Sequence, residues 1–219
     1  MIPPPGLRLV YRLLRKAYGP AGWWPAETAF EVCVGAILTQ NTAWSNVEKA
    51  LGVLRSRGLL SYGRLRGLPA SRLAPLIRSS GVFRVKARRL RAFLDFLGQE
   101  YGGRVSAMRS EKPEMLRRKL LAVNGIGPET ADSIALYAAG HPAFVVDAYT
   151  RRIFGRLGHL HGDERYEEVQ AFFARALPRD AALYNDYHAQ LVRLAKEACR
   201  RKPLCVRCPL DRVCPKRGV

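Results

Sequence analysis

The 219-residue chain is poor in acidic residues and in long apolar segments. It contains 18 Asp and Glu against 37 Lys and Arg, which gives a formal net charge of +19 and a pI near 10.4. It lacks a run of about 18 apolar residues, the minimum for a membrane-spanning helix. Near its start, Pro3 to Pro5 and several basic residues stand where a secretion signal would need an apolar stretch. We therefore expect a soluble, cytoplasmic protein.

No segment of any length alternates apolar and polar residues, so a sheet with one solvated face is excluded. Apolar residues recur instead at helical spacing, as in Phe30, Cys33, Val34 and Ile37. Turns rich in Gly and Pro divide the chain into roughly eight to ten short helices. The sequence predicts an all-α fold, in one unit or two small lobes, with Cys33 as a core residue.

The basic excess predicts a polyanionic partner, because each neutralised phosphate releases condensed counterions. Nucleic acid is the first candidate. An anionic membrane surface would attract the same charge, and a genomic bias toward arginine would account for part of it. Charge alone therefore favours nucleic acid without identifying it.

Four of the five cysteines are clustered near the C-terminus with the spacing C-x5-C-x2-C-x5-C: Cys199, Cys205, Cys208 and Cys214. Reducing intracellular conditions oppose structural disulfides, so the cluster indicates a metal centre. Four thiolates suit either zinc or an iron-sulfur cluster. A single C-x2-C pair with long flanking gaps favours iron-sulfur, with zinc, disulfides or free thiols as the alternatives.

A tight turn joins two apolar-periodic stretches at Asn124, Gly125, Ile126 and Gly127. The glycines permit unusual backbone conformations, and the helix that follows offers free N–H groups to an anion. We expect these four residues to contact a phosphate backbone, although a plain helix connector would use the same sequence.

An apolar run over residues 143–146 ends at Asp147, and a second helix is predicted from Ala148. Asp147 is well suited to cap this helix by accepting backbone N–H bonds. Such bonds also keep a carboxylate ionised, which a catalytic anion requires.

Residues Gly125 to Ala131, Val146-Asp147 and the four cysteines together resemble the endonuclease III superfamily of base-excision DNA glycosylases, from about Trp23 to Cys214. The resemblance implies a two-lobed helix-hairpin-helix glycosylase fold with a C-terminal iron-sulfur cluster loop. Residues 25–136 would form a six-helix lobe holding the hairpin. Residues 1–24 and 137–219 would form the other lobe with a [4Fe-4S] cluster, and the active site would lie in a cleft between the lobes. The expected protein is a monomer that acts on double-stranded DNA containing damaged bases.

The chain departs from this family pattern at two places. The first cysteine gap has five residues, where six are common. Glu129 stands where bifunctional members carry a nucleophilic lysine, and a carboxylate cannot form a Schiff base. The sequence therefore indicates a monofunctional glycosylase with Asp147 as the catalytic group. The alternatives are a bifunctional glycosylase and AP lyase for oxidised pyrimidines that uses another lysine, and a non-catalytic DNA-structure-binding protein.

The tryptophan-rich N-terminal region resembles the 3-methyladenine glycosylase subgroup. That resemblance places Trp23, Trp24, Trp44 and Glu129 around the base pocket. Alkylated purines are cationic and stack well on indole rings, which independently favours them as substrates.

The resemblance also makes Gln40 the first candidate for the side chain that fills the gap left by a flipped nucleotide. Val82 is the second. Surface or turn positions are expected for most of the four histidines, whose spacing is not that of metal ligands: His141, His159, His161 and His188.

Overall fold

The structure is a computed structural model that describes residues 2–21 and 24–219. These residues contain eleven α-helices, three 3-10 helices, one π-helix and no β-strand. The all-α prediction is confirmed. The predicted eight to ten helices were too few, because segments such as α4 (Tyr62–Arg66) and α5 (Ala70–Leu76) are too short to show an apolar stripe.

The chain divides into two compact units. The terminal unit comprises residues 1–24 and 142–219, and the central unit comprises residues 25–141. The sequence expectation placed the second boundary after residue 136. Within the part of the chain that the structure describes, no helix is both long enough and apolar enough to cross a bilayer.

The central unit contains seven α-helices, where the family resemblance implied six. They are α2 (Ala29–Leu38), α3 (Trp44–Ser56), α4, α5, α6 (Phe83–Tyr101), α7 (Pro113–Leu121) and α8 (Pro128–Ser133). Short segments η1 (Arg78–Ser80), η2 (Val105–Ser110) and the π-helical η3 (Ile134–Ala138) complete it.

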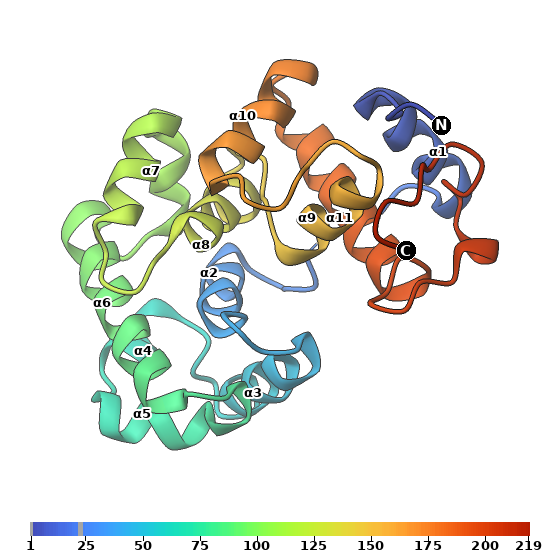
Figure 1. Cartoon of the computed structure of the whole chain (residues 1–219). Helices are drawn as coiled ribbons and strands as arrows, with labels where there is room; N and C mark the ends of the chain where they lie inside the picture. The colour runs from blue at the N-terminus through green and yellow to red at the C-terminus, as the bar shows by residue number, and fades with distance from the viewer. Residues whose placement is uncertain (1, 22–23) are drawn as a thin grey trace. The chain divides into compact units, whose positions relative to one another are not determined.

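Helix α2 is the core of the central unit. It packs against α3, α6, α8 and η3, and every residue from Phe30 to Leu38 is buried, including Cys33 as predicted. Figure 1 shows it in the middle of these neighbours. A helix that is apolar on all sides must be covered on all sides. Thr28 begins the helix by accepting the N–H of Glu31 at 3.1 Å.

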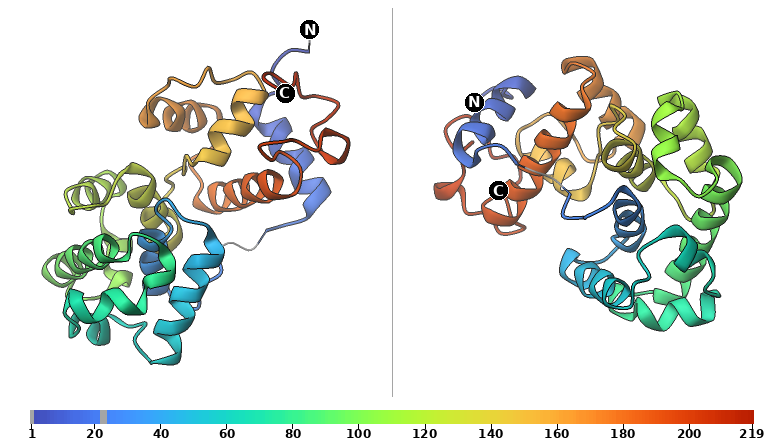
Figure 2. Two further views of the ribbon diagram at one scale, coloured as in Figure 1. Left: turned by 60° about the horizontal axis from the view of Figure 1, so that its bottom comes forward. Right: turned by 180° about the vertical axis from the view of Figure 1, so that it is seen from behind.

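The terminal unit is built from segments at both ends of the chain. Helices α9 (Ala148–Arg156), α10 (Tyr166–Ala176) and α11 (Ala181–Glu197) follow the central unit, and α1 (Leu7–Tyr18) precedes it. Helix α11 packs against both α9 and α1, and the two views of Figure 2 show α1 beside α11. Stacked rings of Phe144 and Phe173, with centroids 3.9 Å apart, form part of the core.

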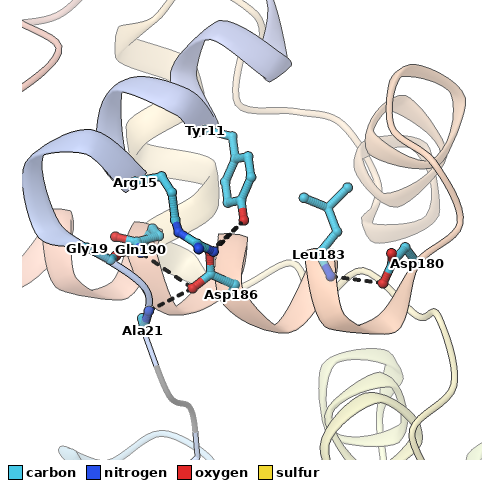
Figure 3. Close-up of polar contacts among 8 residues, drawn as sticks. All are labelled: Tyr11, Arg15, Gly19, Ala21, Asp180, Leu183, Asp186 and Gln190. Atoms are coloured by element: carbon cyan, nitrogen blue, oxygen red, sulfur yellow. Dashed lines mark hydrogen bonds and ion pairs between the residues drawn. The ribbon is translucent and has the colours of Figure 1, made fainter.

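Asp186 of α11 is the main polar link to the N-terminal segment (Figure 3). Its carboxylate accepts hydrogen bonds from the Tyr11 hydroxyl at 2.6 Å, from Arg15 at 2.9 Å and from the Ala21 N–H at 2.7 Å. Gln190, one turn later, donates to the Gly19 carbonyl at 2.6 Å. Burial alone would raise the pKa of Asp186. The hydrogen bonds from Tyr11, Ala21 and Arg15 outweigh burial and lower this pKa. The charged carboxylate thus fixes the position of α11 relative to α1.

Candidate DNA-binding and catalytic residues

Helices α7 and α8 of the central unit are joined by a hairpin turn over residues 122–127. Gly125 adopts φ +84°, a conformation that favours glycine, and a Cβ added there would lie 2.3 Å from Cγ of Arg89. Ile126 is buried and its N–H donates to the Val123 carbonyl, so it anchors the turn. Among the described residues, no protein group accepts a hydrogen bond from the N–H of Gly125 or Gly127. These two N–H groups remain available to an anion.

The two helices of the hairpin are held by a buried ion pair. Arg117 of α7 binds Asp132 of α8 through two contacts, of 2.8 Å and 3.3 Å. Asp132 is fully buried, whereas the Arg117 side chain is 25% exposed. Such a two-point contact fixes direction as well as distance, so it sets the angle between the helices. Asn124, at the tip of the turn, is exposed.

Gln40 follows α2 and lies against the hairpin. Its side-chain nitrogen donates to the Gly125 carbonyl at 2.9 Å and to the Thr130 hydroxyl at 3.0 Å, and its oxygen accepts from Arg89. Both ends of the amide are therefore engaged within the central unit. In this arrangement Gln40 supports the hairpin, and a role as wedge would require it to exchange these bonds for contacts with DNA.

Val82, the other wedge candidate, is 62% exposed at the start of α6. Nearby, Lys86 of α6 links the end of α2 to η1, because its ammonium group donates to the carbonyl of Leu38 at 2.8 Å and also to that of Ser80. Lys86 is fully buried. Burial and the charge of Arg89 lower its pKa to about 8.

Sequence reasoning missed Lys86. It lies four residues before Leu90, at the start of the apolar stripe of α6, and a lysine within such a stripe is the signal that could have found it.

The predicted base-pocket residues belong to different units. Trp24 is half-buried in the terminal unit, and Trp23 lies outside the described residues. Trp44 begins α3 in the central unit and donates its indole N–H to Glu48 at 2.8 Å. Glu129 is exposed in the first turn of α8. Trp24, Trp44 and Glu129 are each accessible, at least in part, within their own unit.

Asp147 is the N-cap of α9, as the sequence indicated. Its Oδ1 accepts the Thr150 N–H at 2.7 Å, and its Oδ2 lies 3.5 Å from Nε2 of His188 on α11. Burial alone would raise the pKa of Asp147, but the charge of His188 and the hydrogen bond from the Thr150 N–H together lower it. The Asp147 side chain retains 16% exposure, so the ionised carboxylate is still reachable.

Surface or turn positions were expected for most histidines, and three of the four, His141, His159 and His161, lie outside the helices, whereas His188 lies within α11. His188 is 5% exposed and faces Asp147, and His141 is 8% exposed with Nε2 3.0 Å from the Met108 carbonyl. His159 contacts the Pro5 carbonyl at 2.8 Å, and His161 is exposed. The spacing of residues along the chain did not indicate that His188 faces Asp147, because the two residues are far apart in the sequence.

The four clustered cysteines line one small cavity in the terminal unit. Arg156 donates to the Cys199 sulfur at 3.3 Å, and the N–H of Lys216 donates to the Cys214 sulfur at 3.4 Å. Such donors stabilise thiolates, so this sulfur-only set fits a thiolate-bound cluster. Over residues 2–21 and 24–219, no group of three or more His, Cys, Asp or Glu side chains is arranged to hold a metal ion. The [4Fe-4S] cluster therefore stays a proposal.

Comparisons with known proteins agree with this architecture. A protein of Methanocaldococcus jannaschii named as a DNA repair glycosylase is 44% identical over 206 residues, 94% of each chain. Endonuclease III of Thermotoga maritima is 31% identical over 186 residues, 84% of this chain and 82% of the relative. The crystal structure of H. pylori 3-methyladenine DNA glycosylase bound to 1,N6-ethenoadenine superimposes with a TM-score of 0.74 at 27% identity. It covers 88% of this chain and 98% of the other.

Residues 34–179 match the family described as HhH-GPD superfamily base excision DNA repair protein. This segment includes the hairpin and Asp147, two of the three motifs that carried the resemblance, and the four clustered cysteines lie beyond it. The chain therefore belongs to the HhH-GPD superfamily of base excision DNA repair proteins, the endonuclease III superfamily to which its motifs had pointed.

Proposed function

We propose that this protein is a monofunctional DNA glycosylase that removes alkylated purine bases from double-stranded DNA. The observation that carries the proposal is Asp147, a largely buried carboxylate that its surroundings keep ionised. An anion at that position opposes the positive charge that develops on the sugar as the base departs. The family match and the relative named as a DNA repair glycosylase support the class of reaction.

The central unit binds the DNA backbone. The N–H groups of Gly125 and Gly127 bind phosphate oxygens, and the net charge of +19 adds affinity that depends on salt. Removing the target nucleotide from the stack costs a few kcal/mol, and Gln40 or Val82 offsets part of that cost by filling the gap. Because Gln40 is already engaged with the hairpin, Val82 is the side chain that needs no rearrangement.

The terminal unit supplies the chemical step. The N-glycosidic bond breaks and its electron pair leaves with the base, so positive charge develops at the sugar carbon. Asp147 stabilises that charge and accepts a proton from the water that adds to the same carbon. The products are a free base and an abasic site. Glu129 cannot supply the amine for a Schiff base, so the strand is not cut.

An alkylated purine is the proposed substrate for two reasons. Its positive charge weakens the glycosidic bond and favours stacking on indole rings such as those of Trp24 and Trp44. In addition, the structural relative bound to 1,N6-ethenoadenine is a 3-methyladenine DNA glycosylase. That Trp23 and Glu129 also line a base pocket stays a prediction of the sequence resemblance.

The four clustered cysteines would hold a [4Fe-4S] cluster in the cavity that they line. The thiolate bonds to iron would cross-link a C-terminal tail that has no apolar stripe of its own. The residues Arg156 and Lys216 orient two of the sulfurs.

The test is to incubate the pure protein with duplex DNA that carries 3-methyladenine, 7-methylguanine or thymine glycol at one defined position. We expect release of an alkylated purine, no strand cleavage, and loss of release in Asp147→Asn. Asp180→Asn is a matched control, because Asp180 also caps a helix of the terminal unit through its carboxylate. Release of thymine glycol alone would overturn the substrate assignment.

A bifunctional enzyme is the second candidate, because an endonuclease III is 31% identical to the chain. Borohydride added during the reaction separates the two candidates, since it traps a Schiff base as a covalent adduct with DNA. A trapped adduct would refute the monofunctional proposal. Unchanged base release in Asp147→Asn would remove the catalytic assignment of that residue.

A further inference from the structure

Asp147 has a neighbour that its helix-capping role does not need. His188 projects from the middle of α11, and its Nε2 lies 3.5 Å from Oδ2 of Asp147. The two side chains are 6% and 16% exposed. Their elements, α11 and the start of α9, pack against each other within the terminal unit. The distance is therefore set by the core of one compact unit.

The other charged groups of these helices have different partners. On α9, Arg151 donates to the Glu164 carbonyl, Arg152 to the Cys199 carbonyl and Arg156 to the carbonyls of Arg200 and Arg201. On α11, Asp186 binds Tyr11 and Arg15, and Arg193 binds Glu197. On α10, the Tyr166 hydroxyl accepts the N–H of Val146. Among the described residues, His188 is the ionisable side chain within ion-pair distance of Asp147.

Different groups contact the two carboxylate oxygens of Asp147. Oδ1 accepts the Thr150 N–H at 2.7 Å, which fixes the carboxylate at the start of α9. Oδ2 faces Nε2 of His188 at 3.5 Å, which brings a positive charge beside this oxygen when the imidazole is protonated. A carboxylate removed from water needs such compensation to remain charged.

We propose that His188 is a positioning residue for base excision, which holds Asp147 ionised and orients its Oδ2. This inference rests on the proposed function, because it takes Asp147 to be the catalytic anion. His188 need not contact the DNA, since it acts through the carboxylate.

The proposal has a definite pH signature. Burial raises the pKa of Asp147, and the charge of His188, 3.5 Å from Oδ2, helps to bring it below the ordinary value. Without His188, the carboxyl group takes up a proton at a higher pH. The acid limb of the rate-pH profile should therefore move toward neutral pH, by about one unit or more. Loss of a merely structural contact would lower the rate at every pH without moving that limb.

Two substitutions separate the charge of His188 from the polar side-chain group that it places beside Oδ2. His188→Phe removes both, and we expect the single-turnover rate at neutral pH to fall by about 10- to 100-fold. His188→Gln keeps a side-chain N–H for Oδ2 but no charge. It should recover much of the rate at mildly alkaline pH while its acid limb stays displaced. His161→Gln is the control, because His161 is exposed in the same unit.

A second measurement needs no substrate. The carboxyl carbons of ¹³C-labelled Asp report ionisation directly by NMR, and the signal that Asp147→Asn removes identifies Asp147. We expect the pKa of this carboxyl to rise in both His188→Phe and His188→Gln. If His188→Phe does not fold, His188→Gln carries the test.

The outcomes distinguish this inference from the proposed function. If Asp147→Asn excises bases normally, the catalytic assignment of Asp147 fails, whatever His188 does. If Asp147→Asn is inactive but the His188 variants keep the wild-type acid limb and the wild-type carboxyl titration, only the positioning role of His188 is overturned.

Discussion

Replacing Lys86 by methionine should change how the stability of the protein depends on pH. Lys86 is fully buried, and its ammonium group donates to the carbonyls of Leu38 and Ser80. No carboxylate of the described residues lies within ion-pair distance of it. Burial, with the nearby charge of Arg89, lowers the pKa of Lys86 from 10.5 to about 8. A neutral amine still has two N–H groups for the two carbonyls.

The sign and size of the effect follow from proton binding. Between about pH 8 and pH 10.5 the unfolded chain keeps the Lys86 proton and the folded protein releases it, so the free energy of unfolding rises with pH. A pKa difference of about 2.5 units corresponds to on the order of 3 kcal/mol. Lys86→Met lacks this pH-dependent contribution to the free energy of unfolding, because methionine does not titrate. The wild-type protein should therefore gain on the order of 3 kcal/mol relative to Lys86→Met from neutral to strongly alkaline pH.

Urea unfolding of both proteins at about pH 7, pH 9 and pH 10.5 measures this difference, and titrations common to both proteins cancel. Lys49→Met is the matched control, because Lys49 is exposed on α3 and should show no such trend. A stability difference between wild type and Lys86→Met that stays constant with pH would refute the reasoning about this buried ammonium group.

Three further predictions concern the hairpin and the cysteines. Gly125→Ala should cost about 1–2 kcal/mol of stability, since φ is +84° and the Arg89 side chain occupies the space of an added Cβ. It should also weaken DNA binding, measured by fluorescence anisotropy. Gly63→Ala is the control and should change neither stability nor DNA binding, because the space around an added Cβ is open. Arg117→Met removes the two-point contact to Asp132 and should cost about 3 kcal/mol in urea unfolding, so an unchanged midpoint would contradict the ion pair's role. Cys208→Ser should abolish bound iron and an absorbance near about 400 nm, and zinc in the wild-type protein would refute the cluster.

Local signals in the sequence predicted the features that depend on a few consecutive residues. The capping role of Asp147, the turn at Gly125 and the buried face that includes Cys33 each require only helix periodicity and short-range hydrogen bonding. The hairpin and Asp147 lie within the family match. The helix count was too low because helices of five to seven residues, such as α4 and α5, carry little periodic signal.

Only the tertiary structure decided which side chains meet. Gln40 reaches Gly125 across 85 residues, Lys86 reaches Leu38 across 48, and His188 faces Asp147 from another helix. The sequence does not reveal these partners, because periodicity assigns a residue to a face but not to a partner on another element. The sequence by itself determined an all-helical, basic chain with a hairpin and a capping aspartate. Packing decided that a buried histidine lies against that aspartate and that a buried lysine reaches the end of α2, since both contacts form only when elements distant in the sequence pack together.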